Sequence, residues 1–196
     1  MPKVKNELKK QLILESAIKI ISQKGYFRST ISNIAKEANV ADGTIYTYFK
    51  NKEDLLIKSF EYVLDNILNE IFAKVINEND VFEKIRIIIK GHLEFMDKNP
   101  DLANFLQIQL RQSKKDIRIR IKNIMRKYYS IIGNILKQGI EEGLIRKDVN
   151  FRVIGHMIFG TVDEIVTSWV LAENGCKLSK KEEDIFKLVK SAIIAQ

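Results

Sequence analysis

Residues 28–56 constrain the fold of this chain most, because they predict two short helices joined by a tight corner. Apolar residues recur at helical spacing over 31–38, so one face of the first helix is expected to be buried. Thr30 is placed to cap that helix with its hydroxyl, and Asn39 tolerates the conformation that a tight corner requires. A second helix, about 42–49, follows the corner. The stretch therefore predicts a helix-turn-helix.

The second helix carries hydroxyl and aromatic side chains opposite its apolar residues, and Lys50 and Lys52 follow it. Such a helix suits the major groove of DNA, where base edges accept and donate hydrogen bonds. The predicted base contacts are Ser32, Thr44 and Thr47. The predicted phosphate contacts are Thr30, Tyr46, Tyr48 and Lys52. The alternative for either tyrosine is that it packs between helices.

Asp42 and Gly43 complete the predicted DNA-facing set at the start of this helix. The preceding residue, Ala41, has no side chain that can cap a helix. Asp42 therefore either takes over part of the cap, where the helix dipole favours an acid, or accepts a hydrogen bond from a cytosine amino group. The sequence leaves both roles open.

The rest of the chain predicts an all-α fold with two domains. Strand signals are almost absent, and helical periodicity continues through residue 194. We expect a helix-turn-helix DNA-binding domain at 1–52 and a ligand-binding and dimerisation domain at 53–196. Apolar runs such as 87–89 are far shorter than the roughly 20 residues of a membrane span. No secretory segment is recognisable and Cys176 is the single cysteine, so we expect a cytoplasmic protein without a membrane partner.

The net charge of +8 is unevenly distributed along the sequence. Residues 111–127 contain eight basic side chains against one acidic side chain, Asp116. This segment is either a solvated face or a binding site for phosphate groups. For the second interpretation Arg111, Arg118 and Arg120 are preferred over the lysines, because a guanidinium binds a phosphate with two parallel hydrogen bonds.

Residues 25–26, 30–35 and 43–55, the last with the sequence GTIYTYFKNKEDL, resemble the TetR family of bacterial transcription regulators. This resemblance implies about nine helices, a homodimer that binds a palindromic DNA duplex, and a ligand cavity in the C-terminal body.

Three segments of the body resemble a branch of that family, the fatty-acid-degradation repressors. They are QLRQS at 109–113, IFGTVDE at 158–164 and TSWV at 167–170. Repressors of this branch release DNA on binding long-chain acyl-CoA, so the resemblance implies a lipid thioester as the effector. The apolar candidates for lining its tunnel are Leu102, Phe105, Leu106, Met125, Tyr128, Tyr129, Met157, Phe159 and Trp169. The competing interpretation is that they form ordinary core.

The two C-terminal helices, about 150–171 and 179–194, carry surplus apolar surface and are predicted to pair with their twofold mates in a homodimer. Ser179 is the expected cap of the last helix. Ile185 and Val189 are the expected interface residues, so that a charge at either should produce monomers.

The sequence does not indicate an enzyme, a metal site or a cofactor. Asp163 and Glu164 are adjacent on a helix and point to different faces, and His92 and His156 lack metal-ligand spacing. We expect a repressor of fatty-acid metabolism genes induced by long-chain acyl-CoA. The alternatives are a related repressor with another inducer, such as a cationic drug, an acyl-CoA-binding protein without a regulatory role, and an all-α enzyme.

Overall fold

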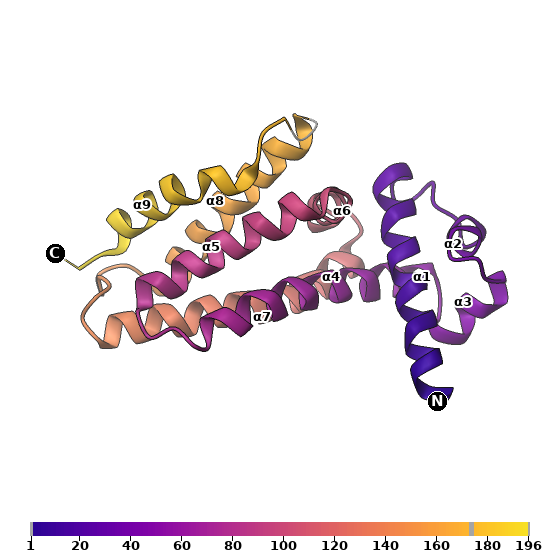
Figure 1. Cartoon of the computed structure of the whole chain (residues 1–196), viewed down its shortest axis with the longest axis horizontal. Coiled ribbons are helices and arrows are strands. Elements are labelled where there is room, and N and C mark those ends of the chain that lie inside the picture. Colours follow the sequence, from indigo (N-terminus) through magenta and orange to yellow (C-terminus); the bar gives the residue numbers. More distant parts are fainter. Residues whose placement is uncertain (1, 173–174, 196) are drawn as a thin grey trace. The chain divides into compact units, whose positions relative to one another are not determined.

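The computed structural model describes residues 2–172 and 175–195, with side chains from Asn6 onward. These residues form nine α-helices and one 3-10 helix (Figure 1). In chain order the helices are α1 (Pro2–Lys24), α2 (Ile31–Glu37), α3 (Asp42–Tyr48), α4 (Lys52–Val75), α5 (Val81–Lys98), α6 (Pro100–Leu110), α7 (Lys115–Glu141), α8 (Phe151–Leu171), η1 (Leu178–Lys181) and α9 (Glu182–Ile193).

The predicted all-α fold is confirmed. Within the described ranges no strand forms, and β interaction is limited to an isolated antiparallel bridge between Ile145 and Ile194. None of the described helices has the length and apolar character needed to cross a membrane.

The chain divides into two compact units. Unit 1 comprises residues 1–64 and 101–122, and unit 2 comprises residues 65–100 and 123–196. Helices α4 and α7 therefore contribute residues to both units. The predicted domain boundary between residues 52 and 53 falls at the start of α4. The division into a DNA-binding domain and a ligand-binding domain at this point stays a prediction.

In unit 1 the helix-turn-helix forms as its local signals predict. Thr30 and Asn33 cap α2 reciprocally: the Thr30 hydroxyl accepts from the Asn33 backbone N–H at 3.1 Å, and the Asn33 side chain accepts from the Thr30 N–H at 3.4 Å. Asn39 takes the left-handed conformation, with φ 51°, at the corner before α3. Asn51 caps α4 by accepting from the Asp54 N–H at 2.8 Å. These local bonds position α3 against α2.

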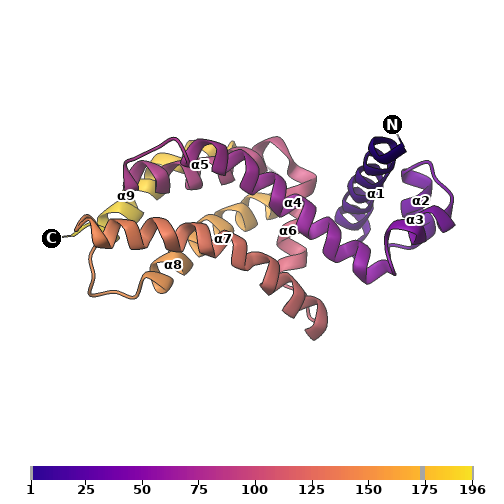
Figure 2. The ribbon, with the colours of Figure 1, turned by 90° about the horizontal axis from the view of Figure 1, so that it is seen from below.

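In unit 2, α5 packs against α8, η1 and α9, while α7 and α8 run beside each other (Figure 2). The interior is apolar and largely aliphatic. Its fully buried side chains include Val81, Ile85, Ile89, Leu93, Leu136, Val162, Val166 and Leu178. Gly143 ends α7 in the left-handed conformation, with φ +73°, as its position in the sequence predicts.

The predicted start of the last helix is wrong. Ser179 lies in η1, and α9 begins at Glu182 without a side-chain cap. Instead, the Asp97 carboxylate of α5 accepts from the backbone N–H groups of Leu178 and Ser179, at 2.7 and 2.9 Å. A carboxylate that is distant in sequence thus satisfies backbone donors at the start of η1, whereas a Ser179 cap would have accepted from residues 181 or 182.

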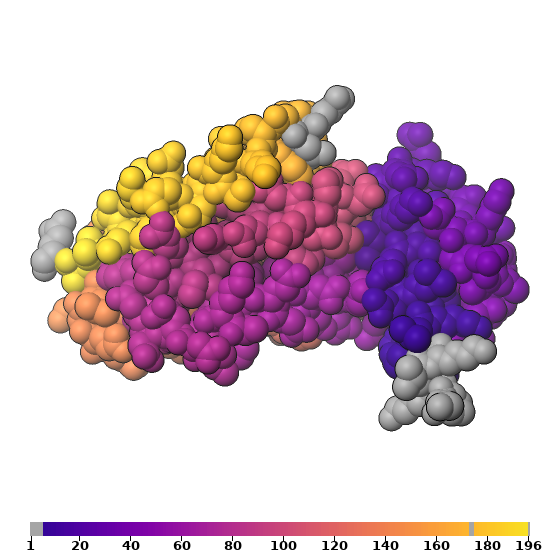
Figure 3. All heavy atoms as spheres, viewed as in Figure 1, coloured from indigo at the N-terminus to yellow at the C-terminus, as the bar shows by residue number. Residues whose placement is uncertain are grey.

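The predicted interface residues of α9 are also wrong. α9 lies along the surface of unit 2 (Figure 3), but Ile185 and Val189 are each only 3% exposed because they face the unit's own core. Leu188 is 71% exposed and marks the outer face of α9.

Candidate functional site

Helix α3 presents most of its polar side chains to solvent. Ile45 is buried against the core of unit 1, as is Phe49 just after the helix. Asp42, Gly43, Tyr46 and Thr47 are exposed, whereas Thr44 and Tyr48 are half-buried. Tyr46 is 56% exposed, which excludes the alternative that it packs between helices. This face has the shape and polarity of a recognition helix.

Several predicted DNA contacts already take part in hydrogen bonds. The Thr47 hydroxyl donates to the Gly43 carbonyl at 3.3 Å, and the Tyr48 hydroxyl donates to the Asn6 side chain at 2.5 Å. The Thr47 oxygen can still accept from a base amino group, whereas a Tyr48 contact with phosphate requires its hydroxyl to donate to DNA in place of Asn6. Ser32 is exposed near the start of α2.

Asp42 stands exposed in the first turn of α3, behind an N-cap, Ala41, that makes no side-chain cap bond. The helix dipole favours an acid at this position. Both roles proposed for Asp42 remain predictions.

Lys52 is directed partly toward its own unit. Its ammonium lies 4.4 Å from the centroid of the Tyr26 ring and donates to the Phe27 carbonyl at 3.4 Å. Burial lowers the pKa of Lys52 from its ordinary value. The charge that was predicted to meet a phosphate is therefore held against the turn between α1 and α2.

In unit 2, three of the predicted ligand residues come together around a histidine. Tyr128, Tyr129 and Phe159 form edge-to-face ring pairs with centroids 5.3 to 6.3 Å apart. His92 joins them, with its Nδ1 atom 3.2 Å from the Tyr128 hydroxyl. Burial lowers the pKa of His92 to about 4, against an opposing effect of Asp163, and burial raises the pKa of Tyr128. The pair is thus a neutral polar group inside an apolar core.

The other apolar candidates have separate environments. Trp169 and Met125 are buried in unit 2, and the Trp169 indole N–H donates to the Cys176 carbonyl at 2.7 Å, which ties α8 to the segment before η1. Met157 is exposed on α8. In unit 1, Phe105 and Leu106 are buried and Leu102 is half-buried on α6.

Two cations of the predicted basic segment are ion-paired where α7 begins. Lys114 is ion-paired with Glu53, whose hydrogen bond raises the Lys114 pKa. Arg120 lies 3.3 Å from Asp54 and 3.9 Å from Glu53. Arg111 donates to the Gln107 carbonyl at 3.1 Å and to its side chain at 2.7 Å. Arg118 is exposed, and the phosphate-binding role of the three arginines stays a prediction.

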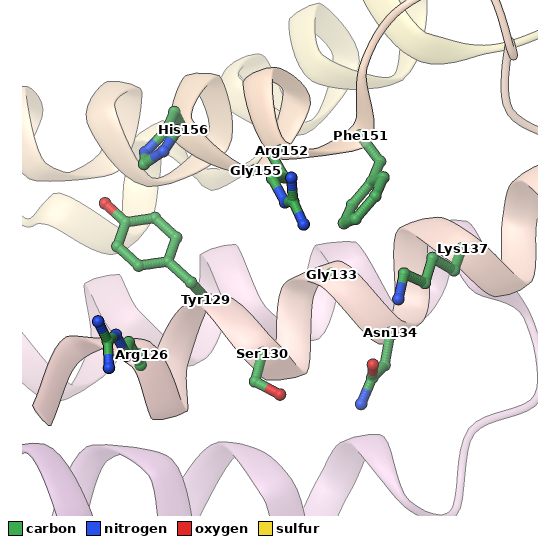
Figure 4. A pocket seen from close by; sticks show the side chains of 10 residues that line it. All are labelled: Arg126, Tyr129, Ser130, Gly133, Asn134, Lys137, Phe151, Arg152, Gly155 and His156. Atoms are coloured by element: carbon green, nitrogen blue, oxygen red, sulfur yellow. The ribbon is translucent and has the colours of Figure 1, made fainter. Parts of the chain in front are cut away.

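A groove of about 350 Å³ lies between α7 and α8. Figure 4 shows Tyr129 and His156 facing each other, while Arg152 and Phe151 extend from α8 toward α7. The Tyr129 and His156 rings are 4.8 Å apart by centroid. The groove, called here the α7–α8 groove, is lined by Arg126, Tyr129, Ser130, Gly133, Asn134, Lys137, Phe151, Arg152, Gly155 and His156.

Both parts of the chain match known protein families. Residues 13–58 match the model of bacterial regulatory proteins of the tetR family, and residues 60–192 match the C-terminal region of YsiA-like proteins. The chain belongs to the TetR family of bacterial regulatory proteins.

Among TetR-family relatives, the chain is 36% identical to the fatty acid metabolism regulator protein of Bacillus subtilis, over 92% of this chain and 93% of that protein. It is also similar to the crystal structure of FadR from Bacillus subtilis in complex with stearoyl-CoA, with a TM-score of 0.90, 36% identity and coverage of 93% and 98%. FadR from Bacillus halodurans gives a TM-score of 0.89 at 33% identity, with coverage of 92% and 97%. The relatives named here are regulators of transcription and metabolism.

Sequence reasoning about this TetR-family chain missed two sets of residues. His92 was considered only as a metal ligand, although a histidine within an apolar helical stripe is a signal of a buried polar pair. Lys137, Phe151 and Arg152 of the groove were not proposed, because they are far from the basic segment in sequence and meet Arg126 only through the packing of α7 on α8.

Proposed function

We propose that this chain is a DNA-binding repressor of fatty-acid metabolism genes that long-chain acyl-CoA releases from its operator. The observation that carries this proposal is the similarity, across both units, to a regulator whose structure was solved with stearoyl-CoA. A repressor of this kind acts on bacterial DNA and hence in the cytoplasm.

In this proposal the exposed face of α3 enters the major groove. Thr44, Thr47 and Ser32 contact bases, with Asp42 and Gly43 at the entry of the helix. The phosphates are contacted by Thr30, Tyr46, Tyr48 and Lys52. A homodimer carries two such helices, separated by about 34 Å or a small multiple of a helical turn, and reads a palindrome.

The proposed dimer interface consists of the outer faces of α8 and α9. Val153, Met157 and Leu171 of α8 and Leu188 of α9 are exposed apolar side chains. Leu188→Glu should yield folded monomers that lose operator binding, measured by light scattering and thermal unfolding. Val189→Glu places a charge in the protomer core and should unfold the chain. A stable Leu188→Glu dimer would contradict this interface.

The acyl chain is proposed to insert among apolar side chains of the body. Each buried CH₂ group contributes about 0.8 kcal/mol of affinity. The neutral pair of His92 and Tyr128 offers hydrogen-bonding groups to the thioester carbonyl within that environment. Among the predicted residues, Met125, Tyr129, Phe159 and Trp169 of unit 2 are the candidates for contacting the chain.

Release requires that the ligand bind one arrangement of the two α3 helices more tightly than the other. α4 contributes residues to both units, so it is the proposed connection. By linkage, operator DNA must weaken acyl-CoA binding by the same factor that acyl-CoA weakens DNA binding.

The test is a titration of the operator-bound protein with stearoyl-CoA, free CoA and stearate, followed by fluorescence anisotropy of the DNA. We expect the intact thioester to release DNA at far lower concentration than either fragment. Equal potency of a fragment would refute the acyl-CoA effector. Failure to prefer operator over random DNA would favour an acyl-CoA-binding protein without a regulatory role.

A further inference from the structure

The start of α1 lies outside the part of the chain that matches the head of the TetR family. That match begins at residue 13, whereas α1 is helical from Pro2. Residues 2–12, called here the α1 extension, contain one acidic side chain, Glu7. Their four basic side chains are Lys3, Lys5, Lys9 and Lys10. Four positive charges against one negative charge give the extension a net charge of +3.

The stability of the helix does not explain these charges. The free N–H groups at the start of a helix carry a partial positive charge, so acidic side chains stabilise the first turn and basic ones destabilise it. The first turns of α4 and α9 contain two and three acidic residues, but the first turn of α1 contains none. The lysines thus lie where they cost the helix stability, and an external anion would offset that cost.

A hydrogen bond fixes the α1 extension beside helix α3. The Tyr48 hydroxyl, at the end of α3, donates to the Asn6 side chain at 2.5 Å. Both residues belong to unit 1, and Figure 1 shows the first turns of α1 beside α3. Because the exposed face of α3 is the face proposed to meet DNA, the extension lies at the edge of that face.

Lys9 and Lys10 lie on the side of α1 that Asn6 occupies. They follow Asn6 by three and four residues, which is the spacing of neighbours on a helix surface. Lys9 is exposed and makes no ion pair with the residues that the structure describes. Lys10 has a long contact with Glu7, at 4.0 Å. Such an exposed pair is weak, so both ammonium groups remain available to an anion.

We propose that the α1 extension is a second DNA-binding element, in which Lys9 and Lys10 contact backbone phosphates next to the site read by α3. The partner is duplex DNA because Asn6 attaches the extension to the recognition helix itself. Phosphate contacts carry no sequence information, so the extension adds affinity and fixes register without adding specificity. This inference rests on the proposed DNA-binding function.

Asn6 acts in this arrangement as a positioning residue. A tyrosine hydroxyl has one proton to donate, and Tyr48 donates it to Asn6. Tyr48 then contributes to DNA binding by holding the extension in place, which differs from its predicted direct contact with a phosphate.

The first test replaces Lys9 and Lys10 by glutamine, singly and together. Fluorescence anisotropy measures binding to random-sequence duplex DNA at several salt concentrations. Each lost phosphate contact should reduce the slope of log affinity against log salt by about 0.9. In a dimer, Lys9→Gln removes two contacts, so the slope should fall by about two units and the affinity at 0.1 M salt by about tenfold or more.

Lys19→Gln is the matched control for the lost charge. Lys19 also lies on α1, but its ammonium is already paired with Glu37 at 2.6 Å. Its substitution should leave the salt slope unchanged. An unchanged slope in the double variant of Lys9 and Lys10, or an equal fall in Lys19→Gln, overturns the proposal.

The second test, Asn6→Asp, separates a role in DNA binding from a role in stability. An aspartate still accepts from the Tyr48 hydroxyl, so the midpoint of thermal unfolding should be retained. Its negative charge beside the phosphates should weaken DNA binding about tenfold at 0.1 M salt. Gln11→Glu adds the same charge about 140° around the helix from Asn6 and should have little effect. If Asn6→Asp binds DNA as the unmodified protein does, no phosphate lies beside Asn6 and the proposal fails.

The remaining outcomes distinguish this proposal from the proposed function. If stearoyl-CoA releases the unmodified protein from its operator but the lysine variants bind DNA as it does, the extension fails and the repressor stands. If the unmodified protein does not prefer operator to random DNA but the lysine variants lose affinity and salt slope, the repressor fails and the extension stands. Absence of binding to any duplex overturns both.

Discussion

The first stretch of α7 and the α7–α8 groove contain the same kinds of side chain, but different groups face them. In unit 1, Lys114 and Arg120 face two carboxylates at the start of α4. In unit 2, Lys137 and Arg152 face a phenylalanine ring. A carboxylate cancels the field of a cation, whereas a ring leaves most of it available. How strongly a cation can attract an anion therefore depends on the side chain that it contacts, and not on the number of basic residues nearby.

The two units also differ in what they bury. Unit 2 encloses an ionisable pair, His92 and Tyr128, whose charged forms are disfavoured by burial. The ion-paired cations of unit 1 lie at its surface, where water screens them. Effects of pH should consequently be large in unit 2, and effects of removing single ion pairs should be small in unit 1.

The largest expected effect is acid destabilisation through His92. Its pKa is 6.5 ordinarily and about 4 in the folded chain. Between these values the unfolded chain binds more protons, so stability falls as the pH decreases from 6.5 toward 4. We expect the free energy of unfolding to fall by about 2 kcal/mol between pH 7 and pH 5, measured by urea unfolding.

The chain offers a matched control, because it has two histidines and His156 is exposed. His92→Gln should abolish most of this pH dependence, and His156→Gln should preserve it. An unchanged pH dependence in His92→Gln would show that unit 2 does not bury its histidine in the folded state.

An intermediate effect is expected for Lys52→Ala. Loss of one phosphate contact should weaken operator and random DNA alike, about tenfold at 0.1 M salt, and should flatten the salt dependence by about one unit of slope. Fluorescence anisotropy at several salt concentrations measures both quantities. Lys147→Ala, at an exposed lysine of unit 2, is the control.

Lys52 also tests the comparison between the units. If the contacts with Tyr26 and Phe27 hold the Lys52 ammonium away from DNA, Lys52→Ala will leave the DNA affinity and its salt dependence unchanged. The predicted phosphate role of Lys52 would then be wrong. Thr47→Ala should instead reduce the preference for operator over random DNA.

The smallest effects are expected at the start of α7. Lys114→Ala and Arg120→Ala should each lower the stability toward urea only slightly, because water screens these solvent-exposed cations. Glu53→Gln removes the carboxylate that both cations contact and should have a similarly small effect on stability, measured by urea unfolding. A large loss of stability in any of these variants would show that water does not screen these ion pairs.

Local signals sufficed to predict the helix-turn-helix. Thr30 caps its helix and Asn39 turns the corner through bonds and dihedrals that involve only near neighbours. The apolar periodicity likewise predicted the helices, because a 3.6-residue repeat specifies which face is buried. Where a cap came from a distant helix, as Asp97 serves Ser179, the prediction was wrong.

The sequence by itself determined the family, the all-α architecture and the polar face of α3, since each depends on residues close together in the chain. Only the tertiary structure decided which face of α9 is free, that His92 meets Tyr128, and which cations remain unpaired. Those properties depend on residues far apart in the sequence, such as Glu53 with Lys114 or Phe151 with Lys137. Helical periodicity shows that a residue is buried or exposed but does not specify the side chain that faces it.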